Sequence, residues 1–256
     1  MLNQMSTIDR RVRILDIINS EGQVAVGELS QKFNVSEVTI RNDLSHLEKK
    51  GLLIKTRGGG LKVQRVGIDQ QLNEKARINY KEKVAIGKKA AELIRDNDTI
   101  IIDSGTTTVE ITKNLNGINN LTVITNALNI ASQLIRDEIK VILLGGVLRT
   151  SSLSLIGPIG ENNIKNFYCD KCFLGVDGID SQSGIFTPNL EEANLNRLMI
   201  EGSKEVIVVT DSSKFKRKSF AHIAPISRVN IIITDSKIPD DEFRNLQNKG
   251  IKVILV

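Results

Sequence analysis

The sequence predicts an α/β protein of two domains: an N-terminal winged helix-turn-helix domain over residues 1–63 and a larger, mostly parallel α/β domain over residues 81–256. Three observations support this prediction. Residues 22–61 carry two short amphipathic helical patterns, a tight turn and a glycine-rich hairpin. Farther along the chain, β-branched runs alternate with helical patterns, which is typical of a parallel sheet covered on both faces. A length of 256 residues also suits two domains, at roughly 100–200 residues per domain.

The first helix is predicted over residues 6–19, and Gly22 follows it as a helix-ending residue. Apolar residues at helical spacing predict its buried stripe: Ile8, Val12, Leu15 and Ile18. Three basic residues are expected on its remaining surface: Arg10, Arg11 and Arg13.

Two further helices are expected, joined by a tight turn at Asn34 and Val35. The second of these begins at Ser36, whose hydroxyl can accept a hydrogen bond from an N–H group of the first turn. At 100° per residue, its apolar side chains share one stripe: Ile40, Leu44 and Leu47. The other side carries Val38, Thr39, Arg41, Asn42, Ser45 and His46. Arg, Asn, Thr and Ser suit base edges and phosphates, so this helix is predicted to read double-stranded operator DNA.

A wing is predicted over residues 52–63, in which Leu53 and Ile54 pair with Leu61 and Val63. The glycines of its tip, Arg57-Gly58-Gly59-Gly60, would permit positive φ and let the backbone approach a phosphate closely. Lys55, Arg57 and Lys62 add positive charge. The predicted DNA-binding residues are Ser36, Thr39, Arg41, Asn42, Ser45, His46, Lys55, Arg57, Gly58 and Gly59.

Two alternatives compete with DNA binding. The first is a small three-helix bundle that only looks like such a module, and the wing that follows the helices disfavours it. The second is an RNA-binding winged helix, which is disfavoured because no exposed aromatic platform accompanies the basic surface.

The charge of the chain favours a polyanionic partner. The formal net charge is +5, and residues 1–63 hold 10 Lys and Arg against 7 Asp and Glu, a net +3. This asymmetry supports nucleic acid over a membrane. No stretch approaches the ~20 apolar residues that span a bilayer, and the N-terminus has no cleavable hydrophobic core. The protein is therefore expected in the cytoplasm, without a membrane partner.

Residues 64–80 lack a sustained apolar period and are predicted to be an interdomain linker with one helical turn. An amphipathic helix over residues 81–95 then begins the second domain, with the apolar residues Val84, Ile86, Ala90, Leu93 and Ile94. Seven strands are expected at 99–103, 121–125, 140–146, 172–177, 205–211, 230–235 and 252–256.

Five of these runs end on a small polar or glycine-containing turn: residues 103–107, 125–126, 145–146, 177–178 and 211–214. Ligands of open α/β sheets bind beyond the carboxyl ends of the strands, so these turns should converge on one cleft. The turn at 104–107 stands between a strand and a helix, where unpaired N–H groups and the helix dipole attract an anion, best a phosphate. A helix N-cap alone would explain one of its hydroxyls. Lys214 either neutralises the same anion or is a solvated surface lysine.

Other candidate residues have structural explanations. Glu191 and Glu192 suit the N-terminus of a helix that begins near Asn189, and they have no further role on that interpretation. Cys169 and Cys172 form a C-x-x-C pair, but a zinc site needs four ligands and the chain has only two histidines. Core packing is expected for Cys172, and neither a metal nor a cofactor is predicted.

Several motifs, in order, resemble the DeoR family of bacterial transcriptional repressors. They are VS-xx-TIR-x-DL-xx-LE-xx-GLL with a GG wing, and then IIDSGTTT, VITN, LLGG-xx-R, FLGVDGID, EEA-xxx-R-x-MI and VVTDSSKF. The sequence departs from the family pattern at Asn42, Arg57 and Lys216, and the first departure puts a common DNA contact in doubt. Thr187-Pro188-Asn189 and Asn196-Arg197 resemble the branch that controls amino-sugar catabolism.

The resemblance implies a second domain similar to ribose-5-phosphate isomerase, with the effector phosphate at the 104–107 turn. It also implies operator DNA, a phosphorylated sugar effector and a homo-oligomer, either dimer or tetramer, as partners. The residues expected to bind the effector are Asp103, Ser104, Gly105, Thr106, Thr107, Thr125, Asn126, Gly145, Gly146, Arg149, Gly175, Asp177, Gly178, Glu192, Arg197, Asp211, Ser213 and Lys214.

The predicted function is a repressor of a sugar catabolic operon, with an amino-sugar operon suggested by the branch, released from DNA by a phosphorylated sugar. The alternative is a sugar-phosphate isomerase or deaminase fused to a DNA-binding domain. Such an enzyme needs a carboxylate base, for which the candidates are Asp103, Asp177, Asp180 and Glu192. Binding without turnover is favoured, because a fused operator-reading module makes a sensor sufficient.

Overall fold

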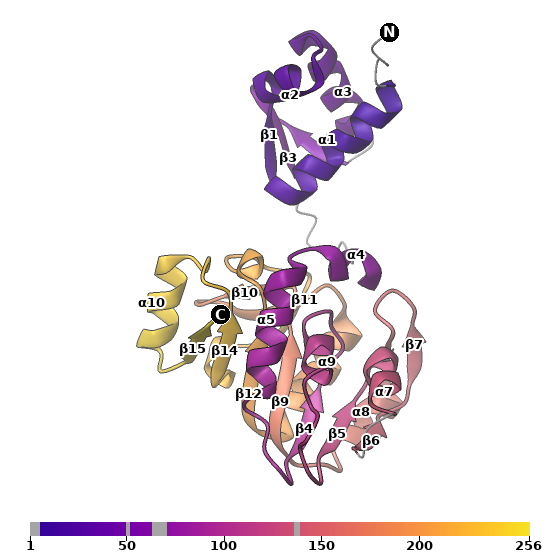
Figure 1. Ribbon diagram of the computed structural model, residues 1–256, viewed down its shortest axis with the longest axis vertical. Helices are drawn as coiled ribbons and strands as arrows, with labels where there is room; N and C mark the ends of the chain where they lie inside the picture. The colour runs from indigo at the N-terminus through magenta and orange to yellow at the C-terminus, as the bar shows by residue number, and fades with distance from the viewer. Residues whose placement is uncertain (1–5, 50–51, 63–70, 136–138) are drawn as a thin grey trace. The chain divides into compact units, whose positions relative to one another are not determined.

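The computed structural model describes residues 6–49, 52–62, 71–135 and 139–256. The chain divides into two compact units, Met1–Arg65 and Val66–Val256 (Figure 1). Each unit has its own hydrophobic core.

The described part of the first unit forms the predicted winged helix-turn-helix. Its elements are α1 (Thr7–Glu21), β1 (Gln23–Ala25), α2 (Val26–Phe33), α3 (Glu37–Lys49), β2 (Leu53–Lys55) and β3 (Gly59–Lys62). The strands pair antiparallel in the order β1-β3-β2. Asn34 ends α2 with a left-handed φ of 50°, which forms the expected turn into α3. The short strand β1 was not predicted.

The buried side of α1 differs from the prediction. Ile14 and Ile18 are fully buried, whereas Val12 is 53% exposed; the side chain of Ile8 lies outside the described part of the unit. Arg10, expected on the surface, is also buried, one turn before Ile14. The expectation for Arg10 was wrong because its guanidinium binds a buried carboxylate of α3, so the buried stripe runs through residues 10, 14 and 18.

The wing forms with Ile54 opposite Leu61 in the register, and Val63 lies outside the described residues. Its glycines act differently from the prediction, because Gly58, Gly59 and Gly60 all lack positive φ. A Cβ atom on Gly59 would lie 1.8 Å from the carbonyl oxygen of Val24 in β1. Glycine is therefore required at position 59 because β1 packs across the wing, and not because the turn is left-handed.

The second unit is built on one parallel sheet. Its seven strands are β4 (Thr99–Ile102), β5 (Thr122–Thr125), β6 (Lys140–Leu143), β9 (Cys169–Gly175), β12 (Ser203–Val209), β14 (Ile231–Thr234) and β15 (Lys252–Leu255). They are ordered β15-β14-β12-β9-β4-β5-β6, and every pair is parallel. The seven predicted runs and the parallel α/β fold class are confirmed.

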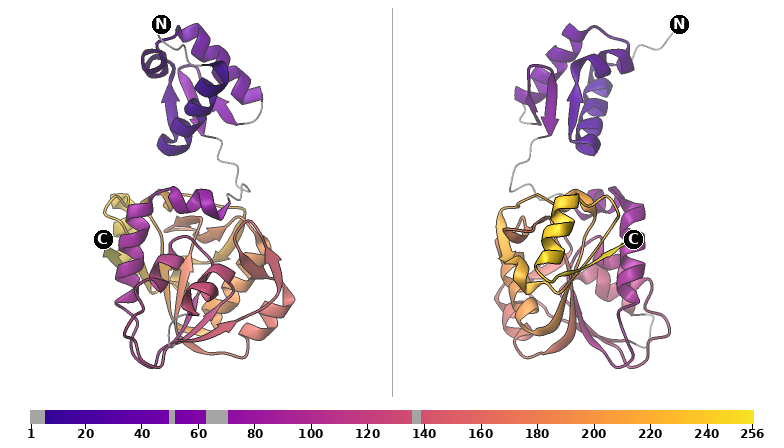
Figure 2. Two further views of the ribbon diagram at one scale, coloured as in Figure 1. Left: turned by 45° about the vertical axis from the view of Figure 1, so that its right-hand side comes forward. Right: turned by 90° about the vertical axis from the view of Figure 1, so that its left-hand side faces the viewer.

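Helices cover both faces of this sheet (Figures 1 and 2). One face packs against α5 (Tyr80–Ala91), α6 (Thr108–Thr112) and α7 (Leu128–Leu134). The other face packs against α8 (Pro158–Ile164), α9 (Leu190–Glu201) and α10 (Asp240–Asn248). Within β4, Ile100 and Ile102 face the first layer and Ile101 the second, as the alternation of side chains along a strand requires.

Smaller elements complete the second unit. They are α4 (Leu72–Arg77), a hairpin of β7 (Val147–Arg149) and β8 (Ser154–Ile156), an antiparallel sheet of β10 (Gly178–Asp180), β11 (Gly184–Thr187) and β13 (Ala221–Ala224), and two short 3₁₀ turns at Ser212–Lys214 and Ile226–Arg228.

The last part of the expected linker, from residue 71 onward, is folded in the structure. Residues 64–70 lie outside the described residues. Residues 72–77 form α4, and α5 begins at Tyr80, so the last part of the expected linker belongs to the second unit. The predicted helix at 81–95 ends at Ala91, and Val84 is 37% exposed instead of buried. Hydrogen bonds to residues distant in sequence, which no local pattern reveals, hold α4 in this position.

Candidate functional site

The exposed face of α3 carries the side chains predicted to contact DNA. The N–H group of Thr39 donates to Ser36 Oγ at 3.2 Å, which is the expected helix cap. Arg41 and Asn42 are exposed, and Arg41 Nη2 pairs with Glu37 Oε2 at 2.7 Å across one turn. Both partners of this pair are about half exposed, at 48% and 49%, so the pair contributes little stability and Arg41 can exchange partners.

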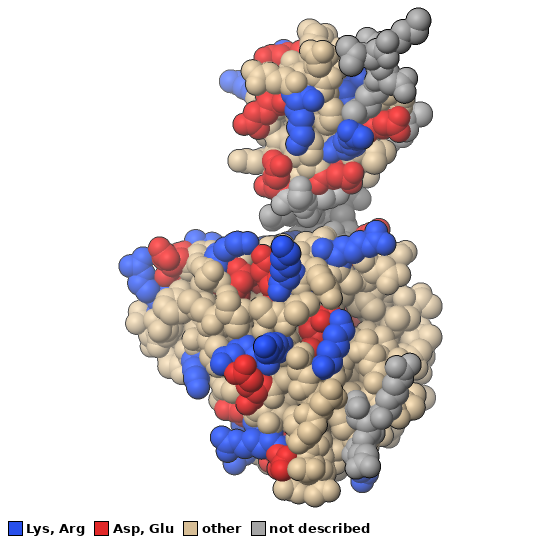
Figure 3. Space-filling model, viewed as in Figure 1, with Lys and Arg blue, Asp and Glu red and all other residues tan. Residues whose placement is uncertain are grey.

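The wing contributes to the same surface. Nζ of Lys55 donates to Ser45 Oγ of α3 at 2.6 Å, which joins the base of the wing to the helix. Ser45 and His46 are half-buried, and Arg57 and Gly58 are exposed at the tip. Gly59 is buried beside β1, unlike Gly58. On the face of the molecule visible in Figure 3, basic and acidic side chains are interspersed over both units.

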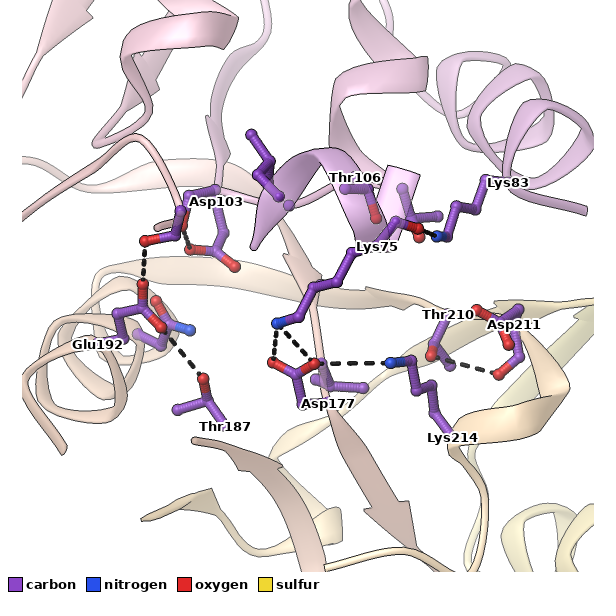
Figure 4. Close-up of a pocket in the computed structure, with 18 of the residues that line it drawn as sticks. Lys75, Lys83, Asp103, Thr106, Asp177, Thr187, Glu192, Thr210, Asp211 and Lys214 are labelled. Carbon is purple, nitrogen blue, oxygen red and sulfur yellow. Dashed lines mark hydrogen bonds and ion pairs between the residues drawn. The ribbon is translucent and has the colours of Figure 1, made fainter. Parts of the chain in front are cut away.

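A cavity in the second unit lies beyond the carboxyl ends of β4, β9 and β12 (Figure 4). The strand order reverses beside it: the chain runs from β4 outward to β5 and β6, and then returns to β9 on the other side of β4. Such a reversal leaves a crevice between the diverging connections, where ligands of α/β proteins bind. Ten of the predicted effector residues line this cavity: Asp103, Ser104, Gly105, Thr106, Thr107, Gly175, Asp177, Glu192, Asp211 and Lys214.

Eight predicted effector residues do not line the cavity: Thr125, Asn126, Gly145, Gly146, Arg149, Gly178, Arg197 and Ser213. The β7–β8 hairpin explains the position of Asn126. The N–H group of Leu155 in β8 donates to the Asn126 carbonyl at 2.7 Å, so the hairpin covers the end of β5. Arg197 lies against β13, with Nε and Nη2 each 3.1 Å from a backbone carbonyl. The expectation that all five turns converge on one cleft was therefore too broad. The turns at 103–107, 177–178 and 211–214 contribute residues to the cavity, and those at 125–126 and 145–146 do not.

Two of these eight residues contact the cavity wall from behind. Nη1 of Arg149 donates to Glu192 Oε1 at 3.1 Å, and Ser213 donates to the Asp211 carboxylate. They support lining residues and do not face the cavity themselves.

The 104–107 turn meets the end of β9 at close range. A Cβ atom on Gly105 would lie 3.0 Å from Thr108 Oγ1 and 3.9 Å from the Cα atom of Gly175. Glycine at both positions leaves space between the turn and the strand end, and Thr106 points into the cavity (Figure 4).

One end of the cavity is rich in ammonium groups. Lys75 and Lys214 both reach the carboxylate of Asp177, at 2.9 and 3.5 Å from Oδ1 (Figure 4). Burial by itself would raise the pKa of Asp177, but these two ammonium groups hold this pKa below its usual value. Lys83 is buried nearby, and this burial lowers its pKa to about 8. The positive charges of Lys214 and Lys75 lower the pKa further, whereas the negative charge of Asp211 opposes the shift.

The other end is acidic and amide-lined. Asp103 is buried, and burial together with the neighbouring Glu192 carboxylate raises the pKa of Asp103 well above its usual value. With the side-chain amide of Asn196 oriented so that its nitrogen faces acceptors, this nitrogen donates to Asp103 Oδ1 at 3.1 Å. Thr187 donates to Glu192 Oε2 at 3.3 Å. These groups offer the mixed donors and acceptors that bind sugar hydroxyls.

Sequence reasoning missed the contributions of Lys75 and Lys83. Lys75 lies in the segment interpreted as linker, where nothing local marks it as part of a site. Lys83 did carry a signal, because it stands three residues before the fully buried Ile86 on the same side of the helix. A lysine on an apolar helix face requires a partner, here the carbonyl oxygen of Lys75.

Neither cysteine is poised for chemistry. Cys169 and Cys172 are free and buried in β9, and burial raises the pKa of Cys169 to about 11 and that of Cys172 well above its usual value. Within the described ranges, no group of three or more His, Cys, Asp or Glu side chains is arranged to hold a metal ion. None of the described helices combines the length and the apolar character needed to cross a membrane.

Comparisons with known proteins match both units. Residues 10–65 match the DeoR-like helix-turn-helix domain, and residues 78–236 match the DeoR C terminal sensor domain. The chain is 40% identical over 253 residues to the putative aga operon transcriptional repressor of Escherichia coli O157:H7, covering 98% of this chain and 94% of that protein. It is 31% identical over 252 residues to the glycerol-3-phosphate regulon repressor of Escherichia coli K12, covering 98% and 100%.

Among solved structures, the chain is similar to ribose 5-phosphate isomerase A from Methanocaldococcus jannaschii, with 16% identity and a TM-score of 0.41 over 54% of this chain and 55% of that one. A DNA-reading winged helix joined to a sensor domain defines a transcriptional regulator. The chain belongs to the DeoR family of transcriptional regulators. The two relatives named by sequence identity are both named as repressors and not as enzymes, which disfavours the alternative of a fused isomerase or deaminase.

Proposed function

We propose that the protein represses a sugar catabolic operon in the cytoplasm and leaves its operator when a phosphorylated sugar binds the cavity of the second unit. The observation that carries the proposal is the division of this cavity into two chemically different ends. Lys75 and Lys214 with the 104–107 turn suit a phosphate, whereas Asp103, Glu192 and Asn196 suit hydroxyls.

Residues 1–63 would read the operator through α3 and the wing, and residues 81–256 would bind the effector and form a homo-oligomer, dimer or tetramer. The exposed side of α3 carries Thr39, Arg41 and Asn42, and the wing adds Lys55 and Arg57. This surface supports the assignment. Thr187-Pro188-Asn189 and Asn196-Arg197, which resemble the amino-sugar branch of the family, favour an amino-sugar operon as the target.

Regulation requires that the effector bind one arrangement of the protein better than another. A ligand with equal affinity for the DNA-bound and free forms would shift nothing, and the coupling must be reciprocal. A coupling of ~1–3 kcal/mol is typical, so sugar phosphate and operator should each weaken the other by roughly 5- to 150-fold.

The test uses a duplex selected from a random DNA pool by the full-length protein. Gel-shift titrations of this duplex with hexose and amino-sugar phosphates, and with their unphosphorylated parents, measure the coupling. We expect one sugar phosphate to lower duplex affinity while its parent does not. A duplex affinity indifferent to every sugar phosphate would contradict the effector class. Conversion of the sugar phosphate or release of ammonia, abolished by Asp103→Asn or Asp177→Asn, would contradict a sensor without catalysis.

A further inference from the structure

The middle of the exposed face of α3 is apolar. Val38, the second residue of this helix, is 63% exposed. The buried residues of α3 are Ile40, Asp43, Leu44 and Leu47. At 3.6 residues per turn, the mean direction of these four side chains is almost opposite to that of Val38. Val38 therefore lies at the centre of the face that α3 turns away from the core of the first unit.

Polar side chains surround Val38 on this face. Its neighbours three, four and seven positions farther along the helix are Arg41, Asn42 and Ser45. Ser45 Oγ donates to the Arg41 carbonyl at 2.8 Å and accepts from Lys55 Nζ of the wing at 2.6 Å. The face thus combines hydrogen-bonding side chains with one apolar side chain at its middle.

The orientation of Val38 is well defined. A valine in a helix strongly prefers one χ1 rotamer, because both of its methyl groups branch at Cβ. The first turn of α3 is fixed by its cap, in which the N–H group of Thr39 donates to Ser36 Oγ at 3.2 Å. A contact made by these methyl groups therefore loses little side-chain entropy, unlike one made by a long arginine or lysine side chain.

Single exposed apolar residues are common on proteins, so exposure alone assigns no role to Val38. Its position is more informative, because the N-terminal residues of a recognition helix contact base edges in the major groove. In that groove only thymine presents an apolar group, its 5-methyl group, whereas the edges of the other bases present hydrogen-bond donors and acceptors. A valine packed on those edges would leave them unpaired, which is unfavourable.

We propose that Val38 contacts the 5-methyl group of a thymine in the operator and makes α3 select thymine at that position. This inference rests on the proposed function, because it assigns one base contact to the helix that reads the operator. Residues four apart lie ~6 Å apart along a helix axis, and successive bases of a strand lie ~3.4 Å apart. The thymine should therefore lie within about two base pairs of the position at which Asn42→Arg changes the sequence preference.

The experiment compares full-length wild-type protein with Val38→Ser and the matched control Val12→Ser. Val12 is also an exposed valine, at 53%, but it lies in α1. Serine and valine have similar helix propensities, so both variants should retain their helices. In the duplex selected by wild type, each thymine is replaced in turn by deoxyuridine, which lacks the methyl group and keeps the base pair. Fluorescence anisotropy at one salt concentration measures each dissociation constant.

We expect at least one thymine whose replacement weakens binding of wild type and Val12→Ser about fourfold, the effect of exposing one methyl-sized group. Val38→Ser should bind the unmodified duplex about four- to tenfold more weakly than wild type does. It should lose less than about twofold on the same replacement, because the coupling requires both methyl-bearing partners. A duplex pool selected by Val38→Ser should lose the thymine preference at this position alone.

The outcomes separate this inference from the proposed function. If wild type selects a duplex but every deoxyuridine replacement affects wild type and Val38→Ser equally, the inference is wrong and operator reading by α3 stands. A coupled thymine far from the position read by Asn42 would also contradict it. If the full-length protein selects no duplex, both are wrong. Circular dichroism and urea unfolding of each variant show whether the fold is retained.

Discussion

The buried carboxylate of Asp43 in α3 accepts a hydrogen bond from Nε of Arg10 in α1 at 2.6 Å. Its second oxygen accepts from Arg11 Nε at 2.7 Å, so one acidic side chain joins the two helices. Removing it would leave the buried Arg10 without a counter-ion, and loss of one partner of a buried pair costs about 3–5 kcal/mol.

We therefore expect Asp43→Ala to destabilise the first unit by about 3 kcal/mol, as measured by urea unfolding of the full chain. Glu37→Ala is the matched control, because it removes the exposed partner of Arg41 and should cost less than about 1 kcal/mol. Equal effects of the two variants would show that burial does not decide the strength of the Asp43 contacts.

Arg41→Ala should weaken binding to the selected duplex by about 1–3 kcal/mol with the fold intact, because Arg41 is exposed on α3 and paired only weakly to Glu37. Asn42→Arg should change the sequence preference. Gel shifts at several salt concentrations provide the measurement, and affinity should fall steeply with salt. Unchanged affinity and preference in both variants, with normal circular dichroism, would remove this helix from the DNA interface.

Gly59→Ala should destabilise the first unit by about 1–3 kcal/mol, because its Cβ atom would collide with the Val24 carbonyl. Gly58→Ala has no heavy atom within 4 Å of the added Cβ and no positive φ, so it should change the free energy of unfolding by less than about 1 kcal/mol. Urea unfolding compares them. A larger loss from Gly58→Ala would indicate that the turn, and not the β1 contact, requires glycine.

Lys214→Ala should weaken sugar-phosphate binding by about 1.5–3 kcal/mol, and Thr106→Ala by about 1 kcal/mol, because an ionised donor makes the stronger hydrogen bond. Both variants should bind the selected duplex and resist release from it. Calorimetry with each phosphate and its unphosphorylated parent measures the effect. Equal affinity of wild type for both members of every pair would contradict a phosphate contact at these residues.

Lys83 should make stability depend on pH. Its pKa falls from 10.5 in the unfolded chain to about 8 in the folded one, so between these values the unfolded chain binds more protons and stability rises with pH. Relative to Lys83→Gln, wild type should gain about 2 kcal/mol between pH 7 and pH 9.5 in urea unfolding. The exposed Lys88→Gln is the control and should follow the wild type. A constant difference between wild type and Lys83→Gln would contradict the lowered pKa.

Local signals were sufficient to predict several elements. The seven strands are recognisable because a parallel strand buried on both faces needs an unbroken β-branched run, and each run lies within a few residues. The start of α3 was predictable because a capping hydroxyl accepts from an N–H group only three residues away, as Ser36 Oγ does from Thr39. The 104–107 turn was recognisable because its glycine and hydroxyl residues are consecutive in the sequence and follow a β-branched run directly.

The tertiary structure decided the features that depend on distant partners. Strand order, which no single run contains, opens the ends of β4, β9 and β12 to the cavity and leaves Asn126 behind a hairpin. The Lys75 pair with Asp177 spans about a hundred residues, so the linker-like composition around Lys75 concealed its place in the site. Composition and periodicity report what a segment can bury by itself, whereas an ion pair or a close backbone contact exists only once the chain has brought its two partners together.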